Sequence, residues 1–360
     1  MNADFDRRFL MDWLTEEDPL RLADLWRMAD TSRRENVGED VHLRGLLEIS
    51  NFCIRQCAYC GLRAPNMQLQ RYRMTEEEIM ECARKAWKLG CGTLVLQGGE
   101  DPGLTRKAVG AVVRRIKEET PLAVTLSLGE RLFDDLAHWR RAGADRYFIR
   151  FETSDTELYR RIHPSLPSRS SARLAILEAL KELGYETGSG IMIGIPGQHV
   201  HSLVEDLLLF RSLDLDMIGV GPYLPHPETP LGRTGAPSPQ SFSDQVLNSE
   251  TMVYKVMALS RLLCPEANIP VTTGLATLNR EGGYEQGLQR GGNVIMPGIT
   301  PLHFGRNYEI YPGKVRFLEI TSAVEEIKKR IRSIGRTVGS GPGERQRHVQ
   351  GTLPGRVSLE

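Results

Sequence analysis

Short apolar runs alternate with amphipathic segments along most of the chain. Segments such as 75–90 and 170–184 carry apolar residues at helical spacing, and Gly184 ends the second where a left-handed glycine cap is expected. Eight apolar runs between such segments have the length and composition of buried strands, at residues 41–50, 92–99, 122–129, 145–152, 186–195, 217–225, 269–277 and 293–300. The pattern predicts strands and helices in regular alternation.

Eight strand–helix units predict parallel strands joined by right-handed crossovers. We expect an α/β protein that forms a complete (βα)8 TIM-type barrel over residues 41–336, with a last helix at 322–335. An open, doubly wound sheet is the alternative architecture. Residues 1–40 hold two helix-like segments, expected as an N-terminal helical extension below the barrel or on its side. Residues 337–360 are rich in Gly, Pro and charge, and we expect a disordered tail there.

The charge balance narrows the range of partners. Lys plus Arg and Asp plus Glu both number 46, so no overall field attracts nucleic acid or an anionic membrane. The first residues lack a basic start followed by an apolar run, and no apolar stretch is long enough to span a bilayer. We expect a cytoplasmic protein that binds neither nucleic acid nor membrane.

Three of the six cysteines stand together in the segment CIRQCAYC, directly after the first predicted strand. Cys53, Cys57 and Cys60 are spaced C-x3-C-x2-C at the end of the barrel where active sites are built. Soft thiolates suit zinc or an iron–sulfur cluster, and structural zinc normally closes with four ligands. Three cysteines therefore favour a metal centre with one open position. The scattered cysteines are expected to be buried apolar residues, namely Cys82, Cys91 and Cys264.

CIRQCAYC resembles the signature of the radical SAM superfamily, including aromatic Tyr59 before the last cysteine. The resemblance implies a [4Fe–4S] cluster held by Cys53, Cys57 and Cys60, whose unique iron is chelated by the amino and carboxylate groups of S-adenosylmethionine (SAM). It also implies that the reduced cluster cleaves SAM to a 5′-deoxyadenosyl radical. A zinc loop and a redox-sensing cysteine cluster are the alternatives.

Other strand ends carry candidate SAM-binding residues. The run Gly98-Gly99-Glu100 resembles the superfamily's GGE motif, whose role is to hold the SAM amino group, although alone it would be an ordinary turn. Arg150 and Glu152 lie on one face of the fourth predicted strand, where paired charges suit a zwitterionic ligand or form a structural ion pair. We expect Arg150 to bind a carboxylate and Glu152 to bind ribose hydroxyls or an amine.

Arg173, which opens the helix after the fourth strand, is a second carboxylate-binding candidate, or a surface charge. Gly194 resembles part of the superfamily's adenine-contact segment, although Gln198 follows where an acid is expected. Tyr223 and Leu224 end the sixth strand between two prolines, where an aromatic ring suits packing on a flat base.

A last group of polar or flexible residues at strand ends is expected near ligands, although the hydroxyls among them would also satisfy polar groups of the barrel. Ser127 is a further candidate for cofactor binding. The candidates for substrate binding are Thr125, Thr272, Thr273, Met296 and Tyr308.

Longer stretches, among them RYRMTEEEI, LVLQGGEDP, GADRYFIRFET and GVGPYLPHPETPL, resemble one branch of the superfamily, the HydE-type [FeFe]-hydrogenase maturases. The likeness covers residues 45–315. It implies a part in assembling the hydrogenase H-cluster, with a radical acting at the sulfur of a cysteine-ligated iron precursor or of a thiazolidine-like analogue. The implied partners are this small or organometallic substrate, an electron donor such as a flavodoxin or ferredoxin, and other hydrogenase maturation proteins.

Departures from related families limit the alternatives. The C-terminal region lacks the extra cysteines of some members, so we expect a single cluster. Biotin synthase needs further cysteines along the barrel strands, and the scattered cysteines do not fall there. Methylornithine synthase shares the element that begins at Glu152, so an amino-acid carbon-skeleton mutase is the enzymatic rival. A non-catalytic metal-binding or electron-carrier protein is the rival from another class.

Overall fold

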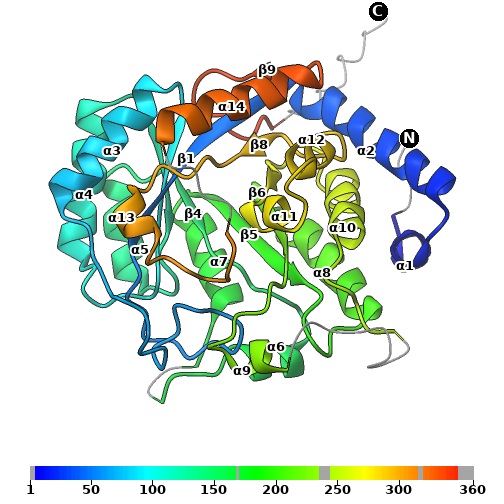
Figure 1. Ribbon diagram of the computed structural model, residues 1–360, viewed down its shortest axis with the longest axis horizontal. Helices are drawn as coiled ribbons and strands as arrows, with labels where there is room; N and C mark the ends of the chain where they lie inside the picture. The colour runs from blue at the N-terminus through cyan, green and yellow to red at the C-terminus, as the bar shows by residue number, and fades with distance from the viewer. Residues whose placement is uncertain (1–4, 168–169, 235–243, 315–318, 348–360) are drawn as a thin grey trace, which may run out of the picture.

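The structure, a computed structural model, describes residues 5–167, 170–234, 244–314 and 319–347. Eight parallel strands form the centre of the molecule, and helices surround them (Figure 1). The strands are β1 (Asp40–Ser50), β2 (Thr93–Gly98), β3 (Ala123–Ser127), β4 (Arg146–Phe148), β5 (Glu186–Ile193), β6 (Met217–Pro222), β7 (Pro270–Val271) and β8 (Val294–Ile295). Each strand pairs with the next in sequence, and β1 pairs with both β2 and β8. The sheet is therefore closed, and the predicted (βα)8 barrel is confirmed.

Most crossover helices lie where the hydrophobic period predicts them. The larger helices are α3 (Glu76–Lys88), α4 (Arg106–Glu119), α5 (Phe133–Arg141), α7 (Arg173–Glu182), α8 (Val200–Ser212), α10 (Glu250–Leu263) and α14 (Ile320–Ser333). Short helices complete the connections at α6 (Thr156–Ile162), α9 (Pro230–Arg233), α11 (Thr273–Leu278), α12 (Gly283–Leu288) and α13 (Leu302–Gly305).

Helix α3 illustrates how local sequence sets these elements. Thr75 accepts a hydrogen bond from the backbone N–H of Glu78, and the Glu78 carboxylate accepts from the backbone N–H of Thr75, which is a complete capping box. The apolar stripe that follows includes Ile79, Met80 and Ala83, all buried against the barrel. The capping box and the buried apolar face therefore define the same helix, and both can be read from the sequence.

Three strands are much shorter than predicted, and one of them, β8, covers only Val294–Ile295 of the run 293–300. The fourth apolar run, 145–152, pairs continuously as β4 only to Phe148, and a single parallel bridge from Glu152 to Ile191 follows, at a residue with a left-handed φ of 67°. The seventh run, 269–277, pairs over Pro270–Val271 and then turns into α11, because the Thr272 side chain caps that helix by accepting from the N–H of Leu275. Thr273 is therefore a helical residue and not part of a strand.

The N-terminal helices α1 (Arg7–Thr15) and α2 (Pro19–Val37) pack on the side of the barrel against α8 and α10 (Figure 1). Their buried faces include Leu10, Leu14 and Leu25. Of the two placements open to this extension, the structure has the lateral one. The division of the chain at residue 40 into an extension and a barrel stays a prediction.

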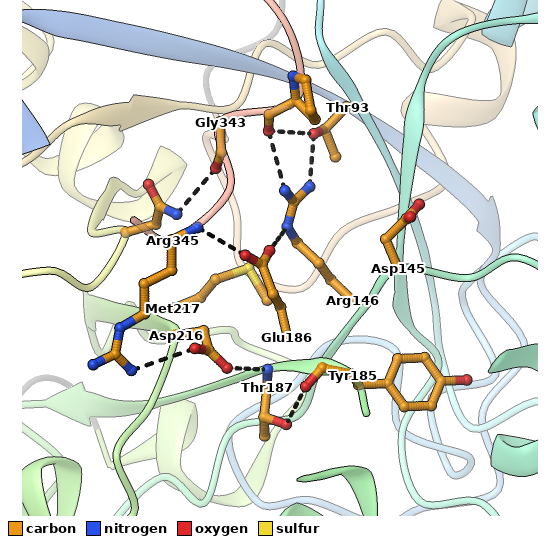
Figure 2. Close-up of polar contacts among 12 residues, drawn as sticks. Thr93, Asp145, Arg146, Tyr185, Glu186, Thr187, Asp216, Met217, Gly343 and Arg345 are labelled. Atoms are coloured by element: carbon orange, nitrogen blue, oxygen red, sulfur yellow. Dashed lines mark hydrogen bonds and ion pairs between the residues drawn. The ribbon is translucent and has the colours of Figure 1, made fainter. Parts of the chain in front are cut away.

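The segment 337–347 differs from the expected disordered tail. Thr337–Val338 forms β9, which pairs in parallel with the start of β1. Residues 339–347, which we call the C-terminal strap, continue to the end of the barrel where the strands begin. Figure 2 shows Gly343 and Arg345 beside Arg146 and Glu186, the first residues of β4 and β5. There Arg146 donates to the carbonyl of Pro342, and the backbone N–H of Arg345 donates to Glu186. Residues 348–360 of the predicted tail lie outside the described residues.

Across the described ranges, no helix is both long enough and apolar enough to cross a membrane.

Candidate active site

The cysteine loop joins the carboxyl end of β1 to the carboxyl end of β2. The N–H of Gly99 donates to the carbonyl of Ser50 at 3.2 Å, and the N–H of Ile54 donates to the carbonyl of Glu100 at 3.0 Å. The Cys53 segment and the Gly98-Gly99-Glu100 run, 38 residues or more apart in sequence, therefore lie against each other at the upper mouth of the barrel. The sequence predicted this juxtaposition from the order of the strands alone.

The three cysteines of the loop are free thiols that act on one another electrostatically. Burial raises the pKa of Cys57 well above its usual value, and the neighbouring Cys60 raises it further. Burial raises the pKa of the Cys60 thiol to about 12, and Cys53 contributes in the same direction. Three neighbouring thiolates would repel one another unless a cationic centre bound them. The donor set therefore fits a soft, positively charged iron centre.

Glu100 lies next to this loop as a buried carboxylate with one free oxygen. Its Oε2 accepts a hydrogen bond from Arg55 Nε at 2.6 Å, and Arg55 Nη2 forms an ion pair with Glu130 at 2.8 Å. Its Oε1 is buried and has no hydrogen-bond partner among the described residues. A buried acceptor without a donor suits an ammonium group, such as the amino group that the GGE motif is expected to hold.

A second charged group lies where β4 ends. The Tyr59 hydroxyl donates to Glu152 Oε1 at 2.9 Å, and Arg150 Nε lies 3.1 Å from Glu152 Oε2. The structure thus brings Arg150 and Glu152 together as predicted, but through the turn at Glu152 and not by strand alternation. Tyr59 comes from the cysteine loop, so this contact joins the predicted cluster site to the predicted SAM site.

Arg173 is buried and contacts the same group from the first turn of α7. Its Nη1 lies 3.8 Å from Glu152 Oε1, and its Nη2 contacts His163 Nε2 at 2.6 Å. Burial, and next the Arg173 charge, lower the pKa of His163 to about 3, so this imidazole is neutral and accepts from the guanidinium. The surface-charge alternative for Arg173 is wrong, because the side chain is only 11% exposed.

A cavity of about 190 Å³ opens inside the barrel below these residues. Its lining includes most of the predicted ligand-binding residues, namely Tyr59, Thr125, Ser127, Arg150, Tyr223, Leu224, Thr272, Thr273 and Met296. Arg44, Tyr311 and Lys314 also line it, and the sequence analysis did not select them. The cavity is the space that the strand-end positions were predicted to surround.

Seven predicted cofactor- or substrate-binding residues do not line this cavity. Five of them belong to the groups described above, namely Gly98, Gly99, Glu100, Glu152 and Arg173, and two lie elsewhere. Gly194, with φ 80°, donates its N–H to Gln198 Oε1 at 2.7 Å, and a Cβ there would come within 2.3 Å of the Asn248 backbone nitrogen. Its glycine is required by the turn and by this close approach, and it does not line the cavity. Tyr308 is buried beside the cysteine loop, where Cys60 and Cys53 act on its hydroxyl, and it is likewise absent from the cavity lining.

Sequence reasoning missed three buried residues that support the site, Arg55, Glu130 and His163. Arg55 lies inside the cysteine motif and was therefore open to detection. Glu130 and His163 follow β3 and α6 without any motif around them. Their roles depend on contacts with distant side chains, which no local pattern encodes.

A barrel with three cysteines in its first loop and a GGE run after its second strand has the architecture of a radical SAM enzyme, and the family model described as "Radical SAM superfamily" matches residues 47–210. The [FeFe] hydrogenase maturase subunit HydE of Thermotoga maritima is 43% identical over 345 residues, covering 96% of this chain and 95% of that protein. The chain therefore belongs to the radical SAM superfamily and, within it, to the HydE-type family.

Two further relatives bear on the choice of function. The 3-methylornithine synthase of Methanosarcina acetivorans is 31% identical over 316 residues, covering 85% of this chain and 83% of that protein. A crystal structure of methylornithine synthase (PylB) superposes with a TM-score of 0.78 at 25% identity, covering 94% of this chain and 95% of that one. This protein therefore shares its fold with methylornithine synthase, an enzyme whose name describes a different reaction.

Proposed function

We propose that this protein is a HydE-type maturase that cleaves SAM reductively during assembly of the [FeFe]-hydrogenase H-cluster. Its substrate would be a cysteine-ligated iron precursor or a thiazolidine-like sulfur compound. The observation that carries the proposal is that the loop with the three cysteines packs against Glu100 and places Tyr59 beside Arg150 in the lining of one cavity, in a chain 43% identical to HydE. An electron donor of the flavodoxin or ferredoxin type completes the system.

The residues present fit a [4Fe–4S] cluster, which Cys53, Cys57 and Cys60 would hold with one iron open. When bound, the cluster supplies the electron that breaks a carbon–sulfur bond of SAM and yields the 5′-deoxyadenosyl radical. The free oxygen of Glu100 would accept from the SAM amino group, and the guanidinium of Arg150 would bind its carboxylate.

Cluster-dependent SAM cleavage tests the enzyme class. Anaerobically reconstituted protein should bind about four irons per chain and, once reduced, should release 5′-deoxyadenosine from SAM. Cys57→Ala should abolish both, because two remaining thiolates do not anchor the cluster. Cys82→Ala is the matched control, since Cys82 is a buried cysteine of α3 away from the loop. Colourless wild-type protein that contains zinc, or cleavage retained by Cys57→Ala, would contradict the proposal.

A mutase is the second candidate, because the chain is 31% identical to a 3-methylornithine synthase and its sequence element beginning at Glu152 resembles that family. Co-expression with the other hydrogenase maturation proteins separates the two. A maturase should restore hydrogen evolution to a strain that lacks its own HydE-type protein. Failure of this rescue, together with rearrangement of lysine in vitro, would assign the mutase function instead.

A further inference from the structure

Hydrogen bonds within the protein hold the two ends of the cysteine loop together. The N–H of Asn51 donates to the carbonyl of Tyr72 at 3.3 Å, and the N–H of Tyr72 donates to Asn51 Oδ1 at 2.7 Å. Ser50 and Arg73 form an antiparallel bridge just outside this pair. Residues 51–72 therefore form a closed loop that contains all three cysteines, and its two ends are held together by hydrogen bonds.

Arg71 lies at the centre of this loop and binds it from within. Its Nη1 donates to the carbonyls of Asn51, at 2.5 Å, and of Leu62, at 2.8 Å. Asn51 lies two residues before Cys53, and Leu62 lies two residues after Cys60. One amino group therefore fixes the distance between the two ends of the segment that carries the cysteines.

The other amino group of Arg71 holds the next turn of the loop. Its Nη2 donates to the carbonyl of Arg63 at 2.9 Å and to the carbonyl of Asn66 at 3.2 Å. Together the two amino groups use four of the five guanidinium N–H groups on backbone acceptors. A lysine, with a single ammonium on a flexible stem, would not reproduce this planar four-point contact.

Among the described residues, Arg71 forms no ion pair with a carboxylate. Burial lowers the pKa of Arg71, and the electrostatic influence of Cys53 and Cys60 opposes that shift. Arg73, two residues on, differs in this respect, because it forms an ion pair with Asp101 at 2.7 Å. A cation bound to neutral carbonyls keeps its full charge next to a negatively charged cluster.

We propose that Arg71 is a positioning residue for the cluster, which shapes the cysteine loop through its four carbonyl contacts and whose charge favours the reduced state of the cluster. This proposal rests on the proposed function, since it needs a cluster bound by the three cysteines. Cluster potentials follow net charge and nearby hydrogen bonds, so a fixed positive charge makes reduction easier. Easier reduction means that a weaker donor suffices to start SAM cleavage.

Two substitutions separate the effect of Arg71 on the shape of the cysteine loop from the effect of its charge on the cluster. Arg71→Gln removes both, so its cluster should be lost to a chelator several times faster than the wild-type cluster. At one fixed applied potential, its ratio of reduced to oxidised cluster should fall about tenfold. Arg71→Lys keeps the charge but not the four contacts, so its chelator sensitivity should rise while its redox ratio stays within about twofold of wild type.

Arg63→Gln is the matched control, because Arg63 belongs to the same loop and donates to a single carbonyl, that of Gln56 at 3.3 Å. Iron content, chelator kinetics and the reduced fraction, measured by electron paramagnetic resonance without SAM, give readouts independent of turnover. Arg63→Gln should match wild type in iron content and chelator kinetics, since it removes only one carbonyl contact, while its reduced fraction should also fall because the charge of Arg63 acts on Cys57 and Cys60. Equal chelator sensitivity of Arg63→Gln and Arg71→Gln would overturn the positioning role, and a redox ratio of Arg71→Lys as low as that of Arg71→Gln would overturn the charge effect. Wild-type protein that assembles no cluster would instead count against the proposed function.

Discussion

Asp206 is a fully buried carboxyl of α8 that supports the turn at Glu152. The N–H of Ser154, two residues after the left-handed Glu152, donates to Asp206 Oδ1, while Oδ2 has no hydrogen-bond partner among the described residues. Burial raises the pKa of Asp206 to about 7, and the hydrogen bonds from Ser154 offset only part of this effect. The protein therefore contains, next to the Glu152 turn, a buried carboxyl whose protonation changes close to neutral pH.

This shift makes the stability of the protein depend on pH in a defined direction. Between the ordinary Asp pKa of 3.8 and about 7, folded Asp206 keeps a proton that the unfolded chain has released, so stability falls as pH rises. Between roughly pH 5 and pH 7.5, the free energy of unfolding of wild type should fall by about 2 kcal/mol more than that of Asp206→Asn. Urea unfolding at both pH values measures the difference. Parallel pH profiles of the two proteins would show that Asp206 is charged throughout.

At the scale of residues, the sequence identified those candidate site residues that stand in a recognisable local motif. Cys53, Cys57 and Cys60 have a diagnostic spacing, and Glu100 follows two glycines. Arg71 and Asp206 were not found, because both act on backbone groups whose positions depend on the folded loop. Propensity and spacing carry no information about such contacts.

At the scale of elements, the end of β2 packs directly on the cysteine loop. A Cβ on Gly99 would lie 2.2 Å from the carbonyl oxygen of Phe52 and 2.7 Å from the Cβ of Cys53. A Cβ on Gly98, the preceding residue, would meet nothing closer than 3.4 Å. The cysteine loop therefore leaves no room for a side chain at Gly99, whereas a methyl group fits at Gly98.

Gly99→Ala should displace Cys53 and lower the iron bound after reconstitution to less than about half of the wild-type content, because ligand positions tolerate errors of only about 0.5 Å. Gly98→Ala should bind iron as wild type does. Metal analysis after desalting measures the content, and circular dichroism verifies that both variants fold. A full complement of iron in Gly99→Ala would mean that the loop adjusts without cost to its ligands.

The elements themselves were predicted well where one pattern dominated. The strands and helices from β1 to β3 follow the apolar runs closely, because period and end signals agree there. The prediction was too long at β4, β7 and β8, where apolar residues continue past the paired strand. The threonine cap at Thr272 ends β7, and beyond β4 the pairing is reduced to one bridge at the left-handed Glu152.

At the scale of the whole molecule, the C-terminal strap closes the end of the barrel opposite the active site. Its carbonyls accept from buried side chains of the barrel: Arg44 donates to Gly343 and Thr93 donates to Pro342. Figure 2 shows Thr93 and Gly343 at this end of the barrel. A Cβ at Gly92 would lie 1.6 Å from the carbonyl oxygen of Gly341, so the strap packs against bare backbone. The Gly- and Pro-rich composition of the strap predicted disorder. In the structure, its small residues instead allow the strap to pack closely into the narrow end of the barrel.

Two arginines of the strap allow a matched test of this closure. Arg345 is 12% exposed and pairs with Asp214 at 2.7 Å, Asp216 at 3.3 Å and Glu266 at 3.2 Å. Arg347 also reaches Asp216, at 3.1 Å, but is 62% exposed. The Asp216 carboxylate is itself buried. Of its two arginine partners, only Arg345 is largely shielded from solvent, so we expect Arg345 to stabilise this buried charge more than Arg347 does.

Arg345→Ala should therefore lower the free energy of unfolding by about 2 kcal/mol, because the buried Asp216 carboxylate then keeps only the exposed Arg347 and the N–H of Thr187. Arg347→Ala should lower it by less than about 1 kcal/mol, as for an exposed ion pair. Denaturant unfolding of both variants measures these values. Because the strap lies at the far end of the barrel, neither change should alter the rate of 5′-deoxyadenosine release at saturating SAM. Equal and small losses of stability would show that the strap rests on the barrel without holding it closed.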